Sequence, residues 1–186
     1  MIILCIADKK PSKPIRQMIE ECQPDMICTL GDLDYFILQD LGGVTNIPKL
    51  GVYGNHCSGN YFDDLGIIDM HCKTYTYNNM VFGGFEGSLK YKESRYAKMY
   101  TQEEAQLLLK DFPAVDVLLA HSPPYGINDE RGSSSHEGFL ALKEYVEKNK
   151  PRYLFHGHTY PTDEELITHY DKTEIIYVSG EKIVVL

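Results

Sequence analysis

Short apolar runs that end beside a residue able to bind a metal recur along this 186-residue chain. Five runs are too short to be typical helices and predict buried strands: 2–6, 26–30, 50–53, 115–120 and 153–155. Each run is followed by aspartate, asparagine or histidine, often next to glycine. These residues are Asp8, Asp32, Asn55, His121, His156 and His158. Because ligand sites of α/β sheets lie at the carboxyl ends of strands, we expect these side chains to converge.

The remaining patterns predict a mixed α/β chain with two packed sheets rather than a single parallel one. Helical patterns cover 14–22, 33–41, 101–110 and 139–147. Asn78-Asn79 predicts a hairpin turn between strands at 75–77 and 80–82, and two more strands are expected at 175–178 and 182–185. The length suits one domain over residues 1–186.

Composition narrows the classes of function. The formal net charge of −9 disfavours binding to the anionic backbone of nucleic acids. The five cysteines form no Cys-x-x-Cys pair, which favours a reducing cytoplasm over a disulfide framework. The apolar start lacks the features of a signal peptide, and no apolar run approaches the ~20 residues that span a bilayer. The apolar strands near the C-terminus permit a homo-oligomer without requiring one.

The residues at the strand ends suit a centre of divalent metal ions. A carboxylate such as that of Asp32 can bridge two ions, and Asn55 offers a neutral amide oxygen. Histidine nitrogens suit manganese, iron or zinc. A site with few carboxylates keeps a net positive charge and attracts phosphate.

The order of these motifs resembles that of the calcineurin-like metallophosphoesterases. The matching residues are Gly31-Asp32, Gly54-Asn55-His56, His121 after a strand, and Gly157-His158. The series spans almost the whole chain, and the stretch 118–160 is similar to a small bacterial branch of that superfamily. The resemblance implies a four-layer αββα sandwich, in which two mixed β-sheets are flanked by helices around two metal ions.

The resemblance also implies a role for each residue. Asp8, Asp32 and His158 would hold the first ion, and Asp32, Asn55, His121 and His156 the second. The ions would be manganese, iron, zinc or nickel. His56 would not be a ligand; it would donate a proton to the leaving alcohol or bind a phosphate oxygen while a metal-bound hydroxide attacks phosphorus.

The sequence departs from the family pattern at several positions. Lys10 stands where a metal-binding histidine is usual, so it either replaces the first ion as a fixed charge or leaves that site weaker. Tyr35 stands where an acidic residue usually orients the catalytic histidine, although Asp34 precedes it. Cys57 follows His56 where aspartate is common. His136, in a Gly/Ser-rich loop, is a candidate neighbour of the site that would compensate for Lys10.

The sequence therefore predicts an enzyme that hydrolyses a phosphomonoester or phosphodiester. We expect a small phosphate-ester substrate, with a nucleotide among the candidates. Two alternatives stay open on the same fold: an interaction scaffold with little or no activity, and a sensor that binds a nucleotide without turnover. A scaffold should expose a large apolar patch away from the metal site.

Overall fold

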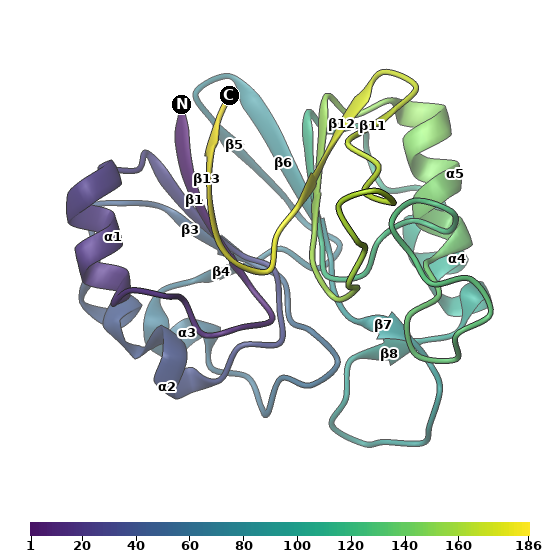
Figure 1. The fold of residues 1–186 in the computed structure, drawn as a ribbon, viewed down its shortest axis with the longest axis horizontal. Coiled ribbons are helices and arrows are strands. Elements are labelled where there is room, and N and C mark those ends of the chain that lie inside the picture. The colour runs from purple at the N-terminus through teal and green to yellow at the C-terminus, as the bar shows by residue number, and fades with distance from the viewer.

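The computed structural model describes all 186 residues, and most of its strands belong to two large sheets that pack face to face (Figure 1). The first sheet has the order β13 (Gly180–Val185), β1 (Ile2–Ala7), β2 (Met26–Thr29), β3 (Lys49–Gly51) and β4 (Ile68–Asp69). The second has the order β11 (His169–Tyr170), β12 (Thr173–Tyr177), β10 (Tyr153–His156), β9 (Val117–Ala120), β6 (Met80–Phe85) and β5 (Thr74–Tyr77). A separate small ladder joins β7 (Ser88–Leu89) to β8 (Met99–Tyr100).

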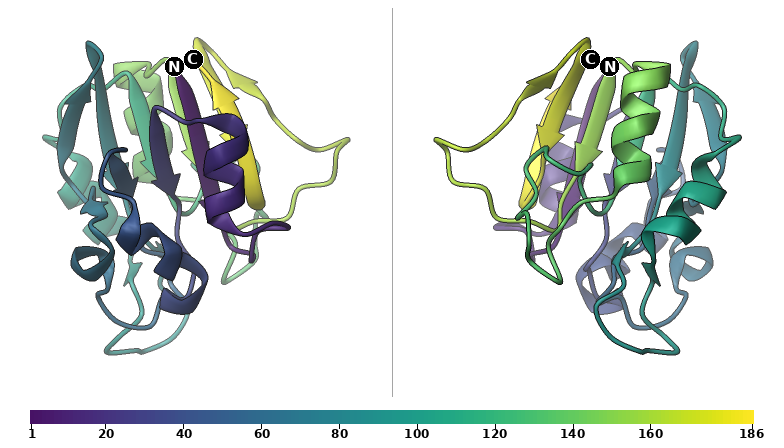
Figure 2. Two further views of the ribbon diagram at one scale, coloured as in Figure 1. Left: turned by 90° about the vertical axis from the view of Figure 1, so that its left-hand side faces the viewer. Right: turned by 90° about the vertical axis from the view of Figure 1, so that its right-hand side faces the viewer.

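Helices cover the outer face of each sheet, which makes four layers. Over the first sheet lie α1 (Ile15–Cys22), α2 (Tyr35–Leu38), the 3-10 helix η1 (Gln39–Gly43) and α3 (Phe62–Leu65). Over the second lie α4 (Gln102–Leu109) and α5 (Leu140–Asn149). Figure 2 shows the purple α1 in front of one sheet and the green α5 in front of the other. The predicted αββα sandwich of two mixed sheets is confirmed.

The alternation of side chains along β1 explains the layers. Ile3 and Cys5 point into the core between the two sheets, whereas Leu4 and Ile6 point into the core beneath α1. Successive side chains of a strand face opposite sides, so a strand that is buried on both faces is apolar at every position. The uninterrupted apolar runs of the sequence are therefore central strands of this sandwich.

Parallel pairing brings the carboxyl ends of the central strands to one edge of the molecule. Strands β1, β2 and β3 are parallel neighbours in the first sheet, as are β6, β9, β10 and β12 in the second. Both sets end at the lower edge in Figure 1. The two predicted tail strands are confirmed, but they join different sheets: β12 pairs with β10 and β13 pairs with β1.

The structure also contains the hairpin turn and the helix cap that the local sequence predicts. Asn78 and Asn79 turn between β5 and β6 with φ of 49° and 61°. Thr101 caps α4 in a capping box with Glu104, as its sequence predicts.

The single helix expected over 33–41 is instead divided into α2 and η1. No helix is long and apolar enough to cross a membrane.

A buried lysine holds the ends of two short helices against the first sheet. Lys49 is only 5% exposed, and its Nζ donates to the carbonyl oxygens of Leu41 at 2.7 Å, Val44 at 2.6 Å and Leu65 at 2.6 Å. These carbonyls lie in or beside the last turns of η1 and α3, where helices leave carbonyl groups without partners. One cation thereby donates to three carbonyl groups, in two buried contacts and one partly buried contact with Val44.

We expect Lys49→Met to lower the free energy of unfolding by about 2–4 kcal/mol, because the Val44 and Leu65 carbonyls lose the ammonium donor, whereas the Leu41 carbonyl keeps the Val44 N–H at 3.0 Å. Urea denaturation would measure the change. Lys73→Met is the matched control, since the Lys73 side chain is 61% exposed and should leave the midpoint unchanged. Equal midpoints for the two variants would contradict this role of Lys49.

Candidate metal centre

Three side chains from both sheets meet at the carboxyl edge of the strands. Asp32 follows β2, His121 follows β9 and His158 follows β10. One ligand atom of each lies within 4.8 Å of the others, which is a spacing that can hold a metal ion. Residues as far apart in the sequence as 32 and 158 are thus neighbours, as the strand-end pattern predicts.

The backbone turns sharply at this group. Asp8, Asp32 and His158 all have left-handed backbones, with φ of 60°, 52° and 69°. Such conformations cost about 1–3 kcal/mol each and cluster at functional sites. Gly31 has φ of 95°, and a Cβ there would lie 2.5 Å from His121 Nδ1, so this turn requires glycine.

His121 presents one nitrogen to the group and anchors the ring with the other. It is fully buried, and its Nδ1 donates to the Leu30 carbonyl at 2.7 Å. Its Nε2 lies 3.1 Å from Asn55 Oδ1 and 3.5 Å from Asp32 Oδ2. Burial alone would lower the pKa of His121, but the charge of Asp32 and its hydrogen bond raise it. A proton or a metal ion on this nitrogen would satisfy the oxygens that face it.

The two aspartates differ in the pKa of their carboxyl groups. Burial alone would raise the pKa of Asp32, but the charge of His121, its hydrogen bond and the His56 N–H lower it to about 2. Burial raises the pKa of Asp8 to about 6. Asp8 Oδ2 accepts from the His158 N–H at 2.9 Å, whereas its Oδ1 is buried without a hydrogen bond, 4.0 Å from His121 Nδ1. That unpartnered oxygen fits a bound cation.

His158 is held as a neutral ligand with a defined tautomer. Its Nε2 donates to the Ser135 carbonyl at 2.8 Å, which leaves Nδ1 with a free lone pair. Burial lowers the pKa of His158 to about 3, so a proton does not compete for that lone pair at pH 7. Carboxylate, amide and imidazole donors together suit a first-row divalent ion.

His156 lies outside this group, although the sequence analysis placed it among the ligands. The Ile167 N–H donates to Asn128 Oδ1 at 2.6 Å, which fixes the orientation of the Asn128 amide. Asn128 Nδ2 then donates to His156 Nε2 at 3.0 Å, and His156 Nδ1 donates to the Gly157 carbonyl at 3.1 Å. Both ring nitrogens are engaged, so no lone pair is left for an ion. Burial lowers the pKa of His156 to about 4, which keeps the ring neutral.

Three other predicted site residues, His56, Asp34 and Lys10, are exposed. His56 is exposed; its N–H donates to Asp32 Oδ1 at 2.8 Å, and its ring has no hydrogen-bond partner. Asp34 precedes α2 and forms no ion pair with His56. Lys10 forms no ion pair with Asp8 and instead lines a hollow with Phe36 and Asp40.

The expected neighbour His136 does lie beside the group. Its ring centroid is 5.3 Å from that of His158, and its Nδ1 is 2.9 Å from Glu130 Oε2. The same loop supplies the Ser135 carbonyl that orients His158. The carbonyls of Leu30 and Ser135 could not be found from sequence, because every residue carries the same backbone group.

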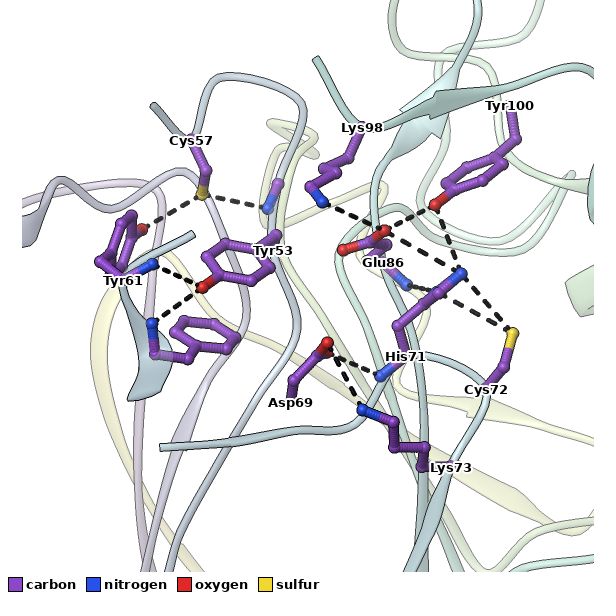
Figure 3. A network of polar contacts seen from close by, with 12 residues as sticks. Tyr53, Cys57, Tyr61, Asp69, His71, Cys72, Lys73, Glu86, Lys98 and Tyr100 are labelled. Atoms are coloured by element: carbon purple, nitrogen blue, oxygen red, sulfur yellow. Dashed lines mark hydrogen bonds and ion pairs between the residues drawn. The ribbon is translucent and has the colours of Figure 1, made fainter. Parts of the chain in front are cut away.

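Cys57 has a structural role in the turn that carries Asn55 and His56. Its Sγ accepts from the Gly54 N–H at 3.2 Å and lies 3.4 Å from the Tyr61 hydroxyl, which donates to the Leu33 carbonyl. Tyr53 Oη accepts from the Tyr61 N–H at 2.8 Å, as Figure 3 shows. These contacts tie both ends of the turn together, so the departure from the family pattern at position 57 leaves the turn supported.

We expect His158→Gln and His156→Gln to separate a ligand from a structural histidine. His158→Gln should weaken manganese binding by more than about 100-fold, since even the loss of an outer-shell partner typically costs 10–100-fold. His156→Gln should keep the manganese and lower the free energy of unfolding by about 1–3 kcal/mol, through its disturbed hydrogen bonds. Metal titration and urea denaturation of both variants measure this; loss of the metal in His156→Gln would contradict the assignment.

Known proteins resemble this chain in sequence family and in fold. The family model for calcineurin-like phosphoesterase matches residues 9–161. One crystal structure aligns with a TM-score of 0.65 and 16% identity over 94% of this chain and 89% of the other. The protein TT1561 of Thermus thermophilus aligns with a TM-score of 0.62 and 12% identity over 96% and 89%, respectively.

A hypothetical protein of the same organism gives a TM-score of 0.53 and 15% identity over 95% of this chain and 75% of the other. At these identities the structural likeness concerns the fold alone. No curated protein matches the sequence. The family model covers well over half of the residues, and the chain therefore belongs to the calcineurin-like phosphoesterase family.

Proposed function

We propose that this protein is a metal-dependent phosphoesterase that hydrolyses a phosphomonoester or a phosphodiester. The observation that carries the proposal is the convergence of Asp32, His121 and His158 within 4.8 Å in a member of this family. The unpartnered, buried Oδ1 of Asp8 beside them supports it. A scaffold protein would have little physical need to bury such a set.

The donors divide unequally between two ion positions. Asp32, Asn55, His121 and His158 would hold one ion, with His158 in the place that the sequence analysis gave to His156. Asp8 and Asp32 would hold the other without an imidazole, because position 10 is lysine and Lys10 lies in another hollow. We therefore expect one tightly held and one weakly held ion. Manganese, iron, zinc and nickel all suit this donor set.

A divalent ion in this place stabilises negative charge on phosphoryl oxygens and lowers the pKa of bound water. The residues of the chain supply orientation and proton transfer. Asp32 stays ionised because its pKa is about 2, so its carboxylate can bind a cation at any physiological pH. His121 and His158 are fixed by the carbonyls of Leu30 and Ser135, and need no reorganisation during the reaction.

His56 is the proposed general acid. Its backbone N–H is fixed on Asp32, whereas its ring is exposed at the rim and free of other partners. The ring is thus available to give a proton to the leaving alkoxide. Asp34 does not orient it, so the proton donor of this protein works without the carboxylate partner that is usual in the family.

The scaffold and sensor alternatives rest on Lys10, Tyr35 and Cys57. Cys57 supports the turn of Asn55, and the Tyr35 ring packs edge-on against Tyr61 with centroids 6.3 Å apart. The most exposed large apolar side chains lie on different elements: Phe36 on α2, Tyr96 between β7 and β8, Leu107 on α4 and Val185 on β13. Because these exposed apolar side chains lie on different elements, they give the scaffold function no specific support. We therefore favour the catalytic function over the scaffold.

We expect manganese-loaded protein to hydrolyse bis-p-nitrophenyl phosphate, and His56→Ala to keep its metal while losing about 10²- to 10⁴-fold in kcat. Asn55→Ala should lose both metal and turnover. His169→Ala, at an exposed histidine of β11, is the control and should behave like the unmodified protein. Bound metal without turnover of this diester or of p-nitrophenyl phosphate would count against the enzyme and favour the sensor.

A further inference from the structure

Two exposed segments of this acidic chain carry opposite charge. Residues 9–16, the basic loop that leads from β1 into α1, hold four cations and no acidic residue: Lys9, Lys10, Lys13 and Arg16. Residues 162–165, the acidic turn between β10 and β11, hold three carboxylates and no basic residue: Asp163, Glu164 and Glu165. All of these side chains are exposed. The formal net charge of the chain is −9, so the basic loop is a local exception to its charge.

The two segments lie at the same edge of the molecule. In both views of Figure 2, the purple loop that follows β1 and the yellow-green loop that precedes β11 are on the same side. Lys9 Nζ lies 5.5 Å from the centroid of the Tyr160 ring, at the start of the second loop. No ion pair joins the basic loop to the acidic turn, and the Lys13 ammonium pairs instead with Glu21 at 2.6 Å. The opposite charges therefore stay unpaired with each other within one molecule.

A hollow of about 450 Å³ lies between the basic loop and α2. Lys10 and Lys13 line it together with apolar side chains that include Ile15 and Phe36. Phe36 is 78% exposed, and Lys10 is in no ion pair. An aromatic side chain with charged groups around it matches the apolar centre and polar rim of protein interfaces. The hollow is thus a candidate docking surface for an acidic segment.

The walls of this hollow are held in place without a partner. The Ser12 N–H donates to Glu181 Oε2 at 3.1 Å, and the Ser12 hydroxyl donates to the other oxygen of that carboxylate. On the α2 side, Gln39 Nε2 donates to the Phe36 carbonyl at 3.0 Å. The Tyr35 ring meets the Phe36 ring edge-on, with centroids 5.7 Å apart. Surfaces that are preformed in this way lose little conformational entropy on association.

The acidic turn is also well defined and presents two free carboxylates. The Glu165 N–H donates to the Thr162 carbonyl at 3.0 Å, and the Thr162 hydroxyl donates to Glu165 Oε2 at 2.8 Å. Asp163 and Glu164 lie between these two residues, are exposed, and form no ion pair or side-chain hydrogen bond. Their carboxylates are therefore available to the ammonium groups of a hollow like the one described above.

A second copy of the chain is the occupant that fits this charge pattern. Since the hollow and the acidic turn lie at one edge, a two-fold axis beside that edge brings each turn against the hollow of the other copy. The contact then forms twice, and carboxylates face ammonium groups each time. Such complementarity steers association and fixes its register. Elsewhere the net charge of −9 keeps two copies apart.

We propose that two copies of this chain associate about a two-fold axis, with the acidic turn of each copy seated in the hollow beside Lys10 and Lys13 of the other. The inference does not rest on the proposed function, because neither segment contains a proposed metal ligand or the proposed general acid.

Sedimentation velocity tests this inference, and we expect the unmodified chain to sediment as a dimer. One variant combines Lys10→Glu with Lys13→Glu, and a second combines Asp163→Lys with Glu164→Lys. Each should weaken the dimer about tenfold or more, because like charges then face each other. A one-to-one mixture of the two variants should regain the dimer, because every contact in that heterodimer again joins opposite charges.

Asp63→Lys with Asp64→Lys reverses two exposed carboxylates of α3 and is the matched control, which should sediment like the unmodified chain. Circular dichroism checks that each variant is folded. A monomer at every concentration up to about 1 mM would overturn the inference. So would a dimer that neither variant weakens, or a mixture of the two variants that stays monomeric. A monomer that binds a synthetic peptide of residues 160–168 would also overturn the dimer, and would indicate an acidic segment of another protein as the occupant.

Discussion

The hydrogen bond from His121 Nδ1 to the Leu30 carbonyl is the contact on which the candidate site depends. It joins the end of β9 in the second sheet to the end of β2 in the first, and both groups are buried. The bond directs Nε2 of the same ring toward Asp32 and Asn55, which come from the opposite sheet. The candidate metal centre is therefore a product of how the two sheets pack, and shifting one sheet against the other would dismantle it.

The sequence predicted the positions of Asp32, His121 and His158 because a simple rule governs them. Strands that are buried on both faces are apolar throughout, so the first polar residue after such a strand marks the edge where ligands bind. The same rule also led us to expect His156 among the ligands, but His156 is the last residue of β10 rather than a residue beyond it. Its side chain alternates with that of Phe155, which faces the core between the sheets. His156 therefore faces Asn128.

Other features depend on tertiary contacts that local patterns do not encode. The carbonyl partners of His121 and His158 are backbone atoms, and their identity follows from loop geometry alone. The division of the two tail strands between different sheets is likewise set by their partners β10 and β1. The amide of Asn128 joins Ile167 to His156 at the end of β10, and the sequence does not distinguish it from any turn asparagine. Lys10 is another such case. Its sequence position suggested a place at the metal centre, whereas its side chain lines a hollow with Phe36 and Asp40.

Anomalous diffraction from crystals of the protein grown with Mn²⁺ tests the central claim most directly. We expect a strong manganese peak coordinated by Asp32, Asn55, His121 and His158, and a weaker peak or none beside Asp8. His156 should keep its hydrogen bond to Asn128. A strong peak coordinated by His156, or manganese bound elsewhere with this group empty, would contradict the proposed centre.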